Sequence, residues 1–110
     1  MREPYKFIAD LDKQMLDLPP DSILSRTFYA DEQAKAILFG FAAGQELSEH
    51  TASRPAILHF LKGEAHLKLG QDEFEVQEGS WAHMPANLPH SVLAKTPVRM
   101  LLYLLENGLE

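Results

Sequence analysis

The chain has 110 residues, of which 45% are hydrophobic, and its formal net charge is −6 with neutral histidines. This length predicts one domain with a packed core, and the acidic balance argues against binding to a nucleic-acid backbone. The absence of cysteine excludes disulfide bonds and thiolate metal sites. No apolar run is long enough to span a membrane and no signal-peptide pattern is present, so we expect a cytoplasmic protein without membrane contact.

Residues 1–21 are predicted to form an N-terminal arm or a short helix. Apolar residues recur near helical spacing between Phe7 and Leu16, and the Pro19-Pro20 pair ends the pattern. An arm of this kind often packs on a neighbouring subunit.

Residues 22–110 are predicted to form a single all-β domain. Short apolar runs are separated by turn residues, and in chain order they are SILSRTFYA, AKAILFGFAAG, AILHFLKG, EAHLKLG, EFEVQEG, WAHMP, HSVLAK and VRMLLYLLE. Their lengths and spacing are typical of a sandwich or barrel of strands. EAHLKLG alternates between apolar and polar residues and so has one wet face, whereas VRMLLYLLE is apolar at nearly every position and should be covered on both faces.

Two stretches contain a histidine at a distinctive spacing from a glycine. Gly44 is followed after five residues by His50, and in GSWAHMPANLPH the glycine Gly79 is followed by Asn87 and then by His90. Together the two stretches resemble the two sequence motifs of a small, single-domain, conserved-barrel cupin. The cupin family usually has glycine where Asn87 stands, and asparagine is the next residue type to tolerate a left-handed backbone.

This resemblance implies a double-stranded β-helix, or jelly-roll barrel, that often holds one divalent metal through three histidines and a glutamate. His50 and His90 match the first and the last ligand of that set. The other two positions hold Ala52 and Ala56, which cannot bind a metal. Because a transition metal in a protein usually has at least three protein ligands, a metal at His50 and His90 would need further donors.

His59 and His83 are the candidates to complete such a metal site. His59 lies three residues after Ala56, so it faces the barrel interior only if a bulge shifts the strand. His83 lies on a strand that should line the barrel near His90. The alternative for each is a structural histidine with a hydrogen-bond partner or a place in a subunit contact.

Two kinds of function remain open from the sequence. The first is a protein that binds a divalent metal and a small organic molecule, with Zn or Ni favoured over Fe or Mn, and with chemistry of the cyclase, isomerase or dioxygenase type if it is an enzyme. The second is a metal-free, non-enzymatic binding or scaffold protein, which the two alanines favour. Both predict a homodimer that covers open sheet edges, and a pocket wall formed by Phe60, Trp81, Met84 and Leu102.

Overall fold

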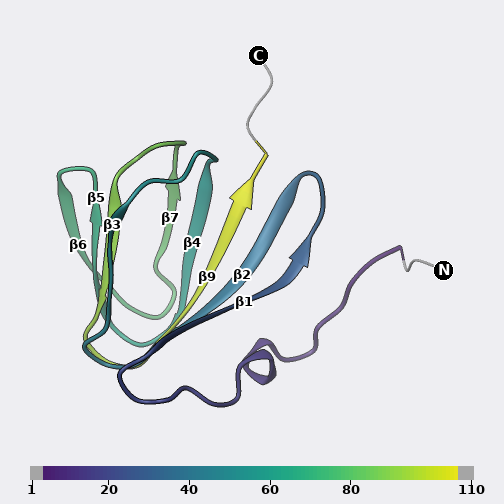
Figure 1. The fold of residues 1–110 in the computed structure, drawn as a ribbon, viewed down its shortest axis with the longest axis horizontal. Helices are drawn as coiled ribbons and strands as arrows, with labels where there is room; N and C mark the ends of the chain where they lie inside the picture. The colour runs from purple at the N-terminus through teal and green to yellow at the C-terminus, as the bar shows by residue number, and fades with distance from the viewer. Residues whose placement is uncertain (1–3, 107–110) are drawn as a thin grey trace.

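The computed structural model describes residues 4–106, so residues 1–3 of the predicted arm and residues 107–110 of the predicted domain lie outside the described residues (Figure 1). The described elements are, in chain order, a 3-10 helix η1 (Leu11–Gln14) and the strands β1 (Ile23–Ala30), β2 (Ala34–Phe41), β3 (Glu46–His50), β4 (Ala56–Lys62), β5 (Ala65–Leu69), β6 (Asp72–Val76), β7 (Trp81–Met84), β8 (His90–Ala94) and β9 (Val98–Leu105). They form a five-stranded antiparallel sheet in the order β1-β2-β9-β4-β7 and a four-stranded antiparallel sheet in the order β3-β8-β5-β6. The all-β jelly-roll prediction is confirmed.

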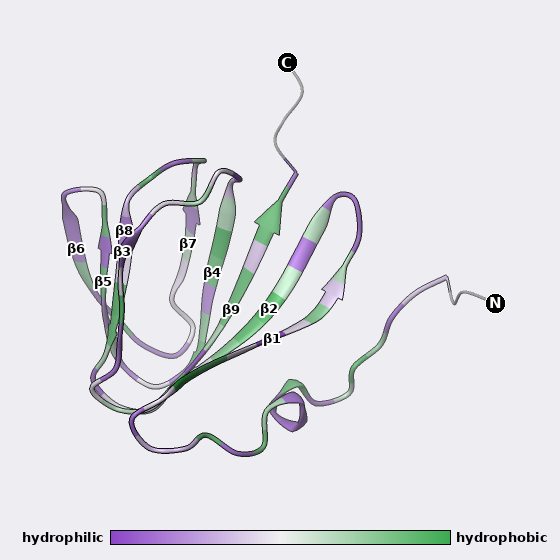
Figure 2. Cartoon of the chain, viewed as in Figure 1, coloured by the Kyte–Doolittle hydropathy of each residue, from purple (hydrophilic) through white to green (hydrophobic). Residues whose placement is uncertain are grey.

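The core lies between the two sheets. On β4, the side chains of Ala56, Leu58 and Phe60 are each 1% exposed, and the residues between them are only partly buried. Since successive side chains of a strand point to opposite faces, this pattern defines the inner face of the five-stranded sheet. Figure 2 shows the apolar character concentrated along β9 and parts of β2 and β4, the middle strands of that sheet.

The outer face of the five-stranded sheet is covered in part by the N-terminal arm. Met15 is buried there and packs in one cluster with Leu38 and Leu101. Gly40 makes room for this contact, because a Cβ at that position would lie 2.5 Å from the Met15 sulfur. The predicted short helix is thus a single 3-10 turn within an otherwise extended arm. Within residues 4–106, no helix has the length and apolar character needed to cross a membrane.

The turn between β4 and β5 brings two backbone segments unusually close. Gly63 has a φ of +91°, and a Cβ placed on it would lie 2.1 Å from the carbonyl oxygen of Pro97. Only glycine combines this left-handed backbone with such an approach. The glycine therefore fixes how the β4–β5 turn meets the turn that precedes β9.

Candidate functional site

His50 and His90, called the histidine pair below, lie side by side at one end of the four-stranded sheet. His50 ends β3, His90 begins β8, and the two residues are partners across the antiparallel ladder. Their ring centroids are 4.2 Å apart and their ring planes are inclined by 57°. His90 is buried, with 3% of its surface exposed, while His50 is exposed. The histidine pair therefore has a covered member and an accessible one.

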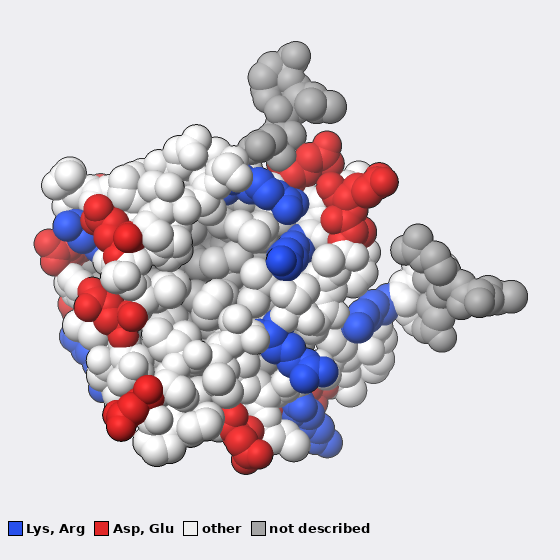
Figure 3. Space-filling view, in the orientation of Figure 1, with Lys and Arg blue, Asp and Glu red and all other residues white. Residues whose placement is uncertain are grey.

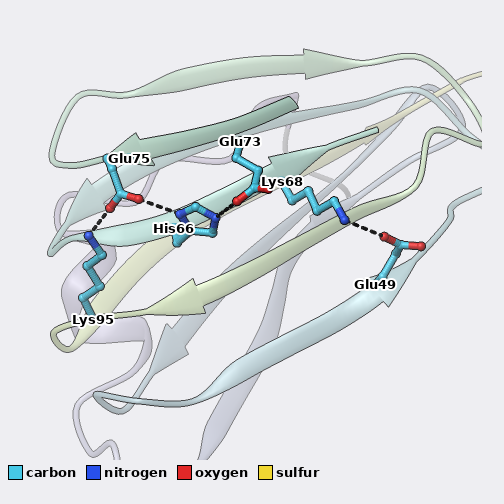
Figure 4. Close-up of polar contacts among 6 residues, drawn as sticks. All are labelled: Glu49, His66, Lys68, Glu73, Glu75 and Lys95. Carbon is cyan, nitrogen blue, oxygen red and sulfur yellow. Dashed lines mark hydrogen bonds and ion pairs between the residues drawn. The ribbon is translucent and has the colours of Figure 1, made fainter. Parts of the chain in front are cut away.

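An extra residue in β3 selects His50 as the neighbour of His90. Leu47 and His50 are three residues apart, whereas their partners on β8 are two residues apart, so the register shifts between them. A bulge of this kind re-aims the side chains that follow it. With a regular ladder, Glu49 would stand opposite His90. The carboxylate of Glu49 instead lies 3.9 Å from the ammonium of Lys68 (Figure 4).

The loops that carry the two histidines are tied to each other. The backbone N–H of Asn87, in the loop before His90, donates a hydrogen bond of 2.7 Å to the carbonyl of Ala52, in the loop after His50. Asn87 has a φ of +68°, so it adopts the left-handed backbone predicted for the position where the cupin family usually has glycine. This bond holds the two connections together at the end of the barrel where the histidine pair lies.

Each ring of the histidine pair is oriented by a backbone carbonyl. His50 Nδ1 lies 2.8 Å from the carbonyl oxygen of Ser48, and His90 Nδ1 lies 2.9 Å from that of Leu88. A carbonyl can only accept, so each Nδ1 carries the hydrogen and each neutral ring has its lone pair on Nε2. Metal-binding histidines commonly show this arrangement, in which a bond at one nitrogen fixes the other as the ligand.

The environment of His90 favours the neutral ring. Burial lowers the pKa of His90 below its ordinary value of 6.5, and charge on His50 lowers it further, while the bond to the Leu88 carbonyl opposes both effects. His90 thus keeps an unprotonated Nε2 at neutral pH. A lone pair of this kind can accept a hydrogen bond or bind a metal.

His59 and His83 lie on a different face of the molecule from the histidine pair. His59 on β4 is paired with Trp81 on β7, and His83 is paired with Ile57. Ile57 and His59 alternate with the buried residues of β4, so these partners all lie on the outer face of the five-stranded sheet. The structure does not bring His59 or His83 to the histidine pair.

The predicted pocket wall is divided between the two faces of that same sheet. Phe60, Met84 and Leu102 are buried on the inner face within one core cluster. Trp81, three residues before Met84 on β7, is not part of this cluster: it is 61% exposed and lines the pocket between β6 and β7.

The described chain supplies no third metal ligand beside the histidine pair. Ala56, which stands where the cupin family usually has glutamate, is buried on the inner face and paired with Met84. Within residues 4–106, no group of three histidine, cysteine, aspartate or glutamate residues is placed to hold a metal ion. The donor set is two imidazoles, which match the type of ligand that zinc and nickel prefer but fall short of the usual number.

An apolar pocket lies between the edge strands β6 and β7, and neither residue of the histidine pair is among its lining residues. It has a volume of about 380 Å³, and its lining includes Leu69, Phe74 and Val76. Leu69 is the cross-strand partner of His90 on β5. Figure 3 shows that the face viewed in Figure 1 has a hollowed, uncharged centre with charges toward its rim. Of the predicted pocket residues, Trp81 lines this pocket. Leu69 and Phe74 were not predicted, because they appear as ordinary alternating apolar residues until strand register is known.

The outer face of the four-stranded sheet carries a network of charged side chains (Figure 4). His66 lies between two carboxylates, with Nε2 2.8 Å from Glu73 and Nδ1 2.6 Å from Glu75. Lys95 contacts Glu75 on its other side. The bond to Glu75, and next the bond to Glu73, raise the pKa of His66 above 6.5, and the bond to Lys95 is the main cause that lowers the pKa of Glu75 below 4.5.

This network predicts a pH-dependent contribution of His66 to stability. Because the folded pKa of His66 is raised, its contribution is complete below about pH 6.5 and is lost as the pH rises through the raised value. The contribution of Glu75, whose folded pKa is lowered, is complete above about pH 4.5 and is lost as the pH falls through the lowered value. We expect His66→Gln to lower the free energy of unfolding most between these two pH values, as measured by urea unfolding across pH.

A matched control for this measurement is His83→Gln, which removes a histidine from a strand of the other sheet. None of the ion pairs among residues 4–106 includes His83. A His66→Gln loss that stays constant from mildly acidic to alkaline pH would contradict the prediction.

Comparisons with known proteins identify the family. Residues 37–104 match the cupin domain family, so the chain belongs to the cupin family. A conserved protein of unknown function from Streptococcus pyogenes is similar in structure, with 27% identity, a TM-score of 0.82 and coverage of 97% of this chain and 93% of that one. A cupin superfamily protein from Desulfitobacterium hafniense has 21% identity and a TM-score of 0.83, with 94% of each chain covered. A cupin 2 conserved barrel domain protein from Leptotrichia buccalis has 28% identity and a TM-score of 0.77, covering 86% of this chain and 46% of that one. No curated protein matches the chain.

Proposed function

We propose that the chain binds a small organic molecule at the histidine pair, together with a divalent metal ion held by Nε2 of His50 and Nε2 of His90. The observation that carries this proposal is that both rings direct Nδ1 at a backbone carbonyl, with centroids 4.2 Å apart. Each neutral ring then keeps its lone pair on Nε2, and the two rings are neighbours. Zn and Ni suit two imidazoles best, and Fe or Mn suit them less well.

The residues around the histidine pair support a ligand that is partly apolar. Leu69 lies next to His90 and lines the pocket between β6 and β7. The apolar part of a small organic molecule would lie against Leu69 while its polar group faces the imidazoles. The exposed His50 would leave the site open to the ligand, while Nε2 of the buried His90 would hold the metal. A bound metal would supply Lewis acidity, and the ligand or water would supply the donors that Ala52 and Ala56 do not.

The alternative is a metal-free binding protein that uses the same two imidazoles. The alanines at positions 52 and 56 favour it, since half of the family's usual ligand set is missing. In that case the histidine pair contacts the small molecule directly through hydrogen bonds. The two proposals differ in one measurable property, which is the affinity of the ligand-free protein for divalent metals.

Metal titration of protein purified without a metal-affinity tag separates the two proposals. We expect about one Zn²⁺ or Ni²⁺ to bind per chain, and we expect His50→Ala and His90→Ala each to weaken binding by about 100-fold, since loss of even an outer partner costs 10–100-fold. Isothermal titration calorimetry with elemental analysis measures this. His59→Ala and His83→Ala are the matched controls, because both remove a histidine from the outer face of the other sheet. A wild-type protein that refuses both metals would leave only the metal-free alternative.

A homodimer is part of the same proposal. Tyr5, Phe7 and Leu16 of the arm are 71%, 78% and 76% exposed, and Trp81 presents a further large apolar surface on the sheet face that the arm partly covers. Contact between two copies would bury such surface. A monomeric mass by light scattering at micromolar concentration would contradict the dimer without affecting the histidine pair.

A further inference from the structure

Arg99 is a cation on the outer face of the five-stranded sheet that forms no ion pair within the described residues 4–106. It is the second residue of β9 and pairs with Gly40 on β2. Its Nη1 is buried and has no hydrogen-bond partner among residues 4–106. None of the ion pairs in the same part of the chain involves Arg99. A buried charged donor without a partner is costly, so an arrangement of this kind points to a group that completes it.

Arg99 also lines a pocket. It has a volume of about 510 Å³ and is formed where the end of the N-terminal arm meets the ends of β2 and β9. Its lining residues are Leu18, Pro20, Asp21, Ala42, Ala43, Pro97 and Arg99. The volume falls within the range of small-molecule sites, and a mostly apolar wall with a few charged groups, here Arg99 and Asp21, is the usual composition of such a site.

The chemistry of the wall selects the ligand class. A guanidinium presents parallel N–H donors that match the two oxygens of a carboxylate. Leu18 and Pro97 offer apolar surface for the body of the ligand. Asp21 is the acidic residue in the wall, and it forms no ion pair with Arg99. Its carboxylate would repel a bound anion and therefore weaken binding to a measurable degree.

We propose that this pocket, the Arg99 pocket, binds a small organic carboxylate, with the carboxylate on the Arg99 guanidinium and the apolar body against the arm. The Arg99 pocket lies on the outer face of the five-stranded sheet, whereas the histidine pair belongs to the four-stranded sheet. The inference is therefore independent of the function proposed for the histidine pair.

Binding of hexanoate tests the Arg99 pocket, with hexanamide as an uncharged probe of nearly the same shape. We expect hexanoate to bind the wild-type protein and hexanamide to bind at least about tenfold more weakly, as followed by nuclear magnetic resonance titration. Arg99→Gln should weaken hexanoate binding by about tenfold or more. Asp21→Asn should strengthen it by about twofold or more, because it removes the like charge and asparagine tolerates the φ of +59° at this position.

The matched control is Arg26→Gln, which removes an exposed arginine on β1 outside the Arg99 pocket and should leave hexanoate affinity unchanged. Circular dichroism checks that each variant is folded. If Arg99→Gln does not fold, the Asp21→Asn result decides, and an unchanged affinity there overturns the proposal. It is also overturned if hexanoate does not bind, if hexanamide binds as tightly, or if folded Arg99→Gln binds like the wild type.

Discussion

Replacing Gly63 with alanine is expected to lower the free energy of unfolding by more than about 3 kcal/mol. Two costs add at this position. The φ of +91° lies in the left-handed region that side chains disfavour, and the new Cβ would lie 2.1 Å from the Pro97 carbonyl oxygen. Because that oxygen belongs to the backbone, no rotation of a side chain can relieve the contact. The β4–β5 turn and the turn before β9 would have to separate.

Gly44→Ala is the matched control for this result. Gly44 has a similar φ of +84°, but a Cβ on it would have no heavy atom within 4 Å. The Gly44→Ala substitution should therefore lower the free energy of unfolding only by the cost of the left-handed backbone conformation, about 1–2 kcal/mol. Urea unfolding of both variants measures the difference, which isolates the cost of the Pro97 contact. Equal losses in the two variants would show that the turns around Gly63 can move apart without cost.

Replacing Ala56 with glutamate is expected to make the stability of the protein depend on metal. Ala56 is buried on the inner face at the start of β4, so a carboxylate there is desolvated and should destabilise the metal-free protein by about 3–5 kcal/mol. Added Zn²⁺ or Ni²⁺ should recover much of this loss if the carboxylate joins the metal proposed at the histidine pair. We expect metal affinity to rise on the order of 100-fold over the wild type.

The neighbouring substitution Ile57→Glu is the control for this prediction. Ile57 is on the same strand but faces outward and is partly exposed. It should cost less stability and give no metal-dependent recovery. Thermal unfolding with and without metal measures both variants. A metal response in Ile57→Glu, or none in Ala56→Glu, would contradict the placement of a metal at the histidine pair.

Period-two alternation predicted most of the fold, and it failed where a strand has little inner surface. The run that contains Leu67 alternates clearly, and it forms the core strand β5. β3 was not among the predicted runs, because its residues ELSEH are mostly polar and only Leu47 packs against the core. An edge strand with one inward side chain and a bulge leaves almost no periodic signal in the sequence.

The candidate site could be predicted only as far as sequence spacing reaches. The glycine–histidine spacings drew attention to His50 and His90, whose rings the structure places together. The orientation of His59, His83 and Trp81 depends on which face of each strand is covered, and that depends on the partner strands and the opposite sheet. Arg99 could not be predicted as a site residue, because the sequence does not show that its buried Nη1 lacks a hydrogen-bond partner among residues 4–106.

The extra residue in β3 also determines which side chain stands opposite His90 at this end of the barrel. Glu49 precedes His50 directly and lies one backbone step from the position opposite His90. A slip of the strand by that step would pair the buried imidazole with a carboxylate instead of a second imidazole. Changes in the length of the adjoining loops can therefore convert this end of the barrel from a two-base site to an acid–base site with no substitution at either position.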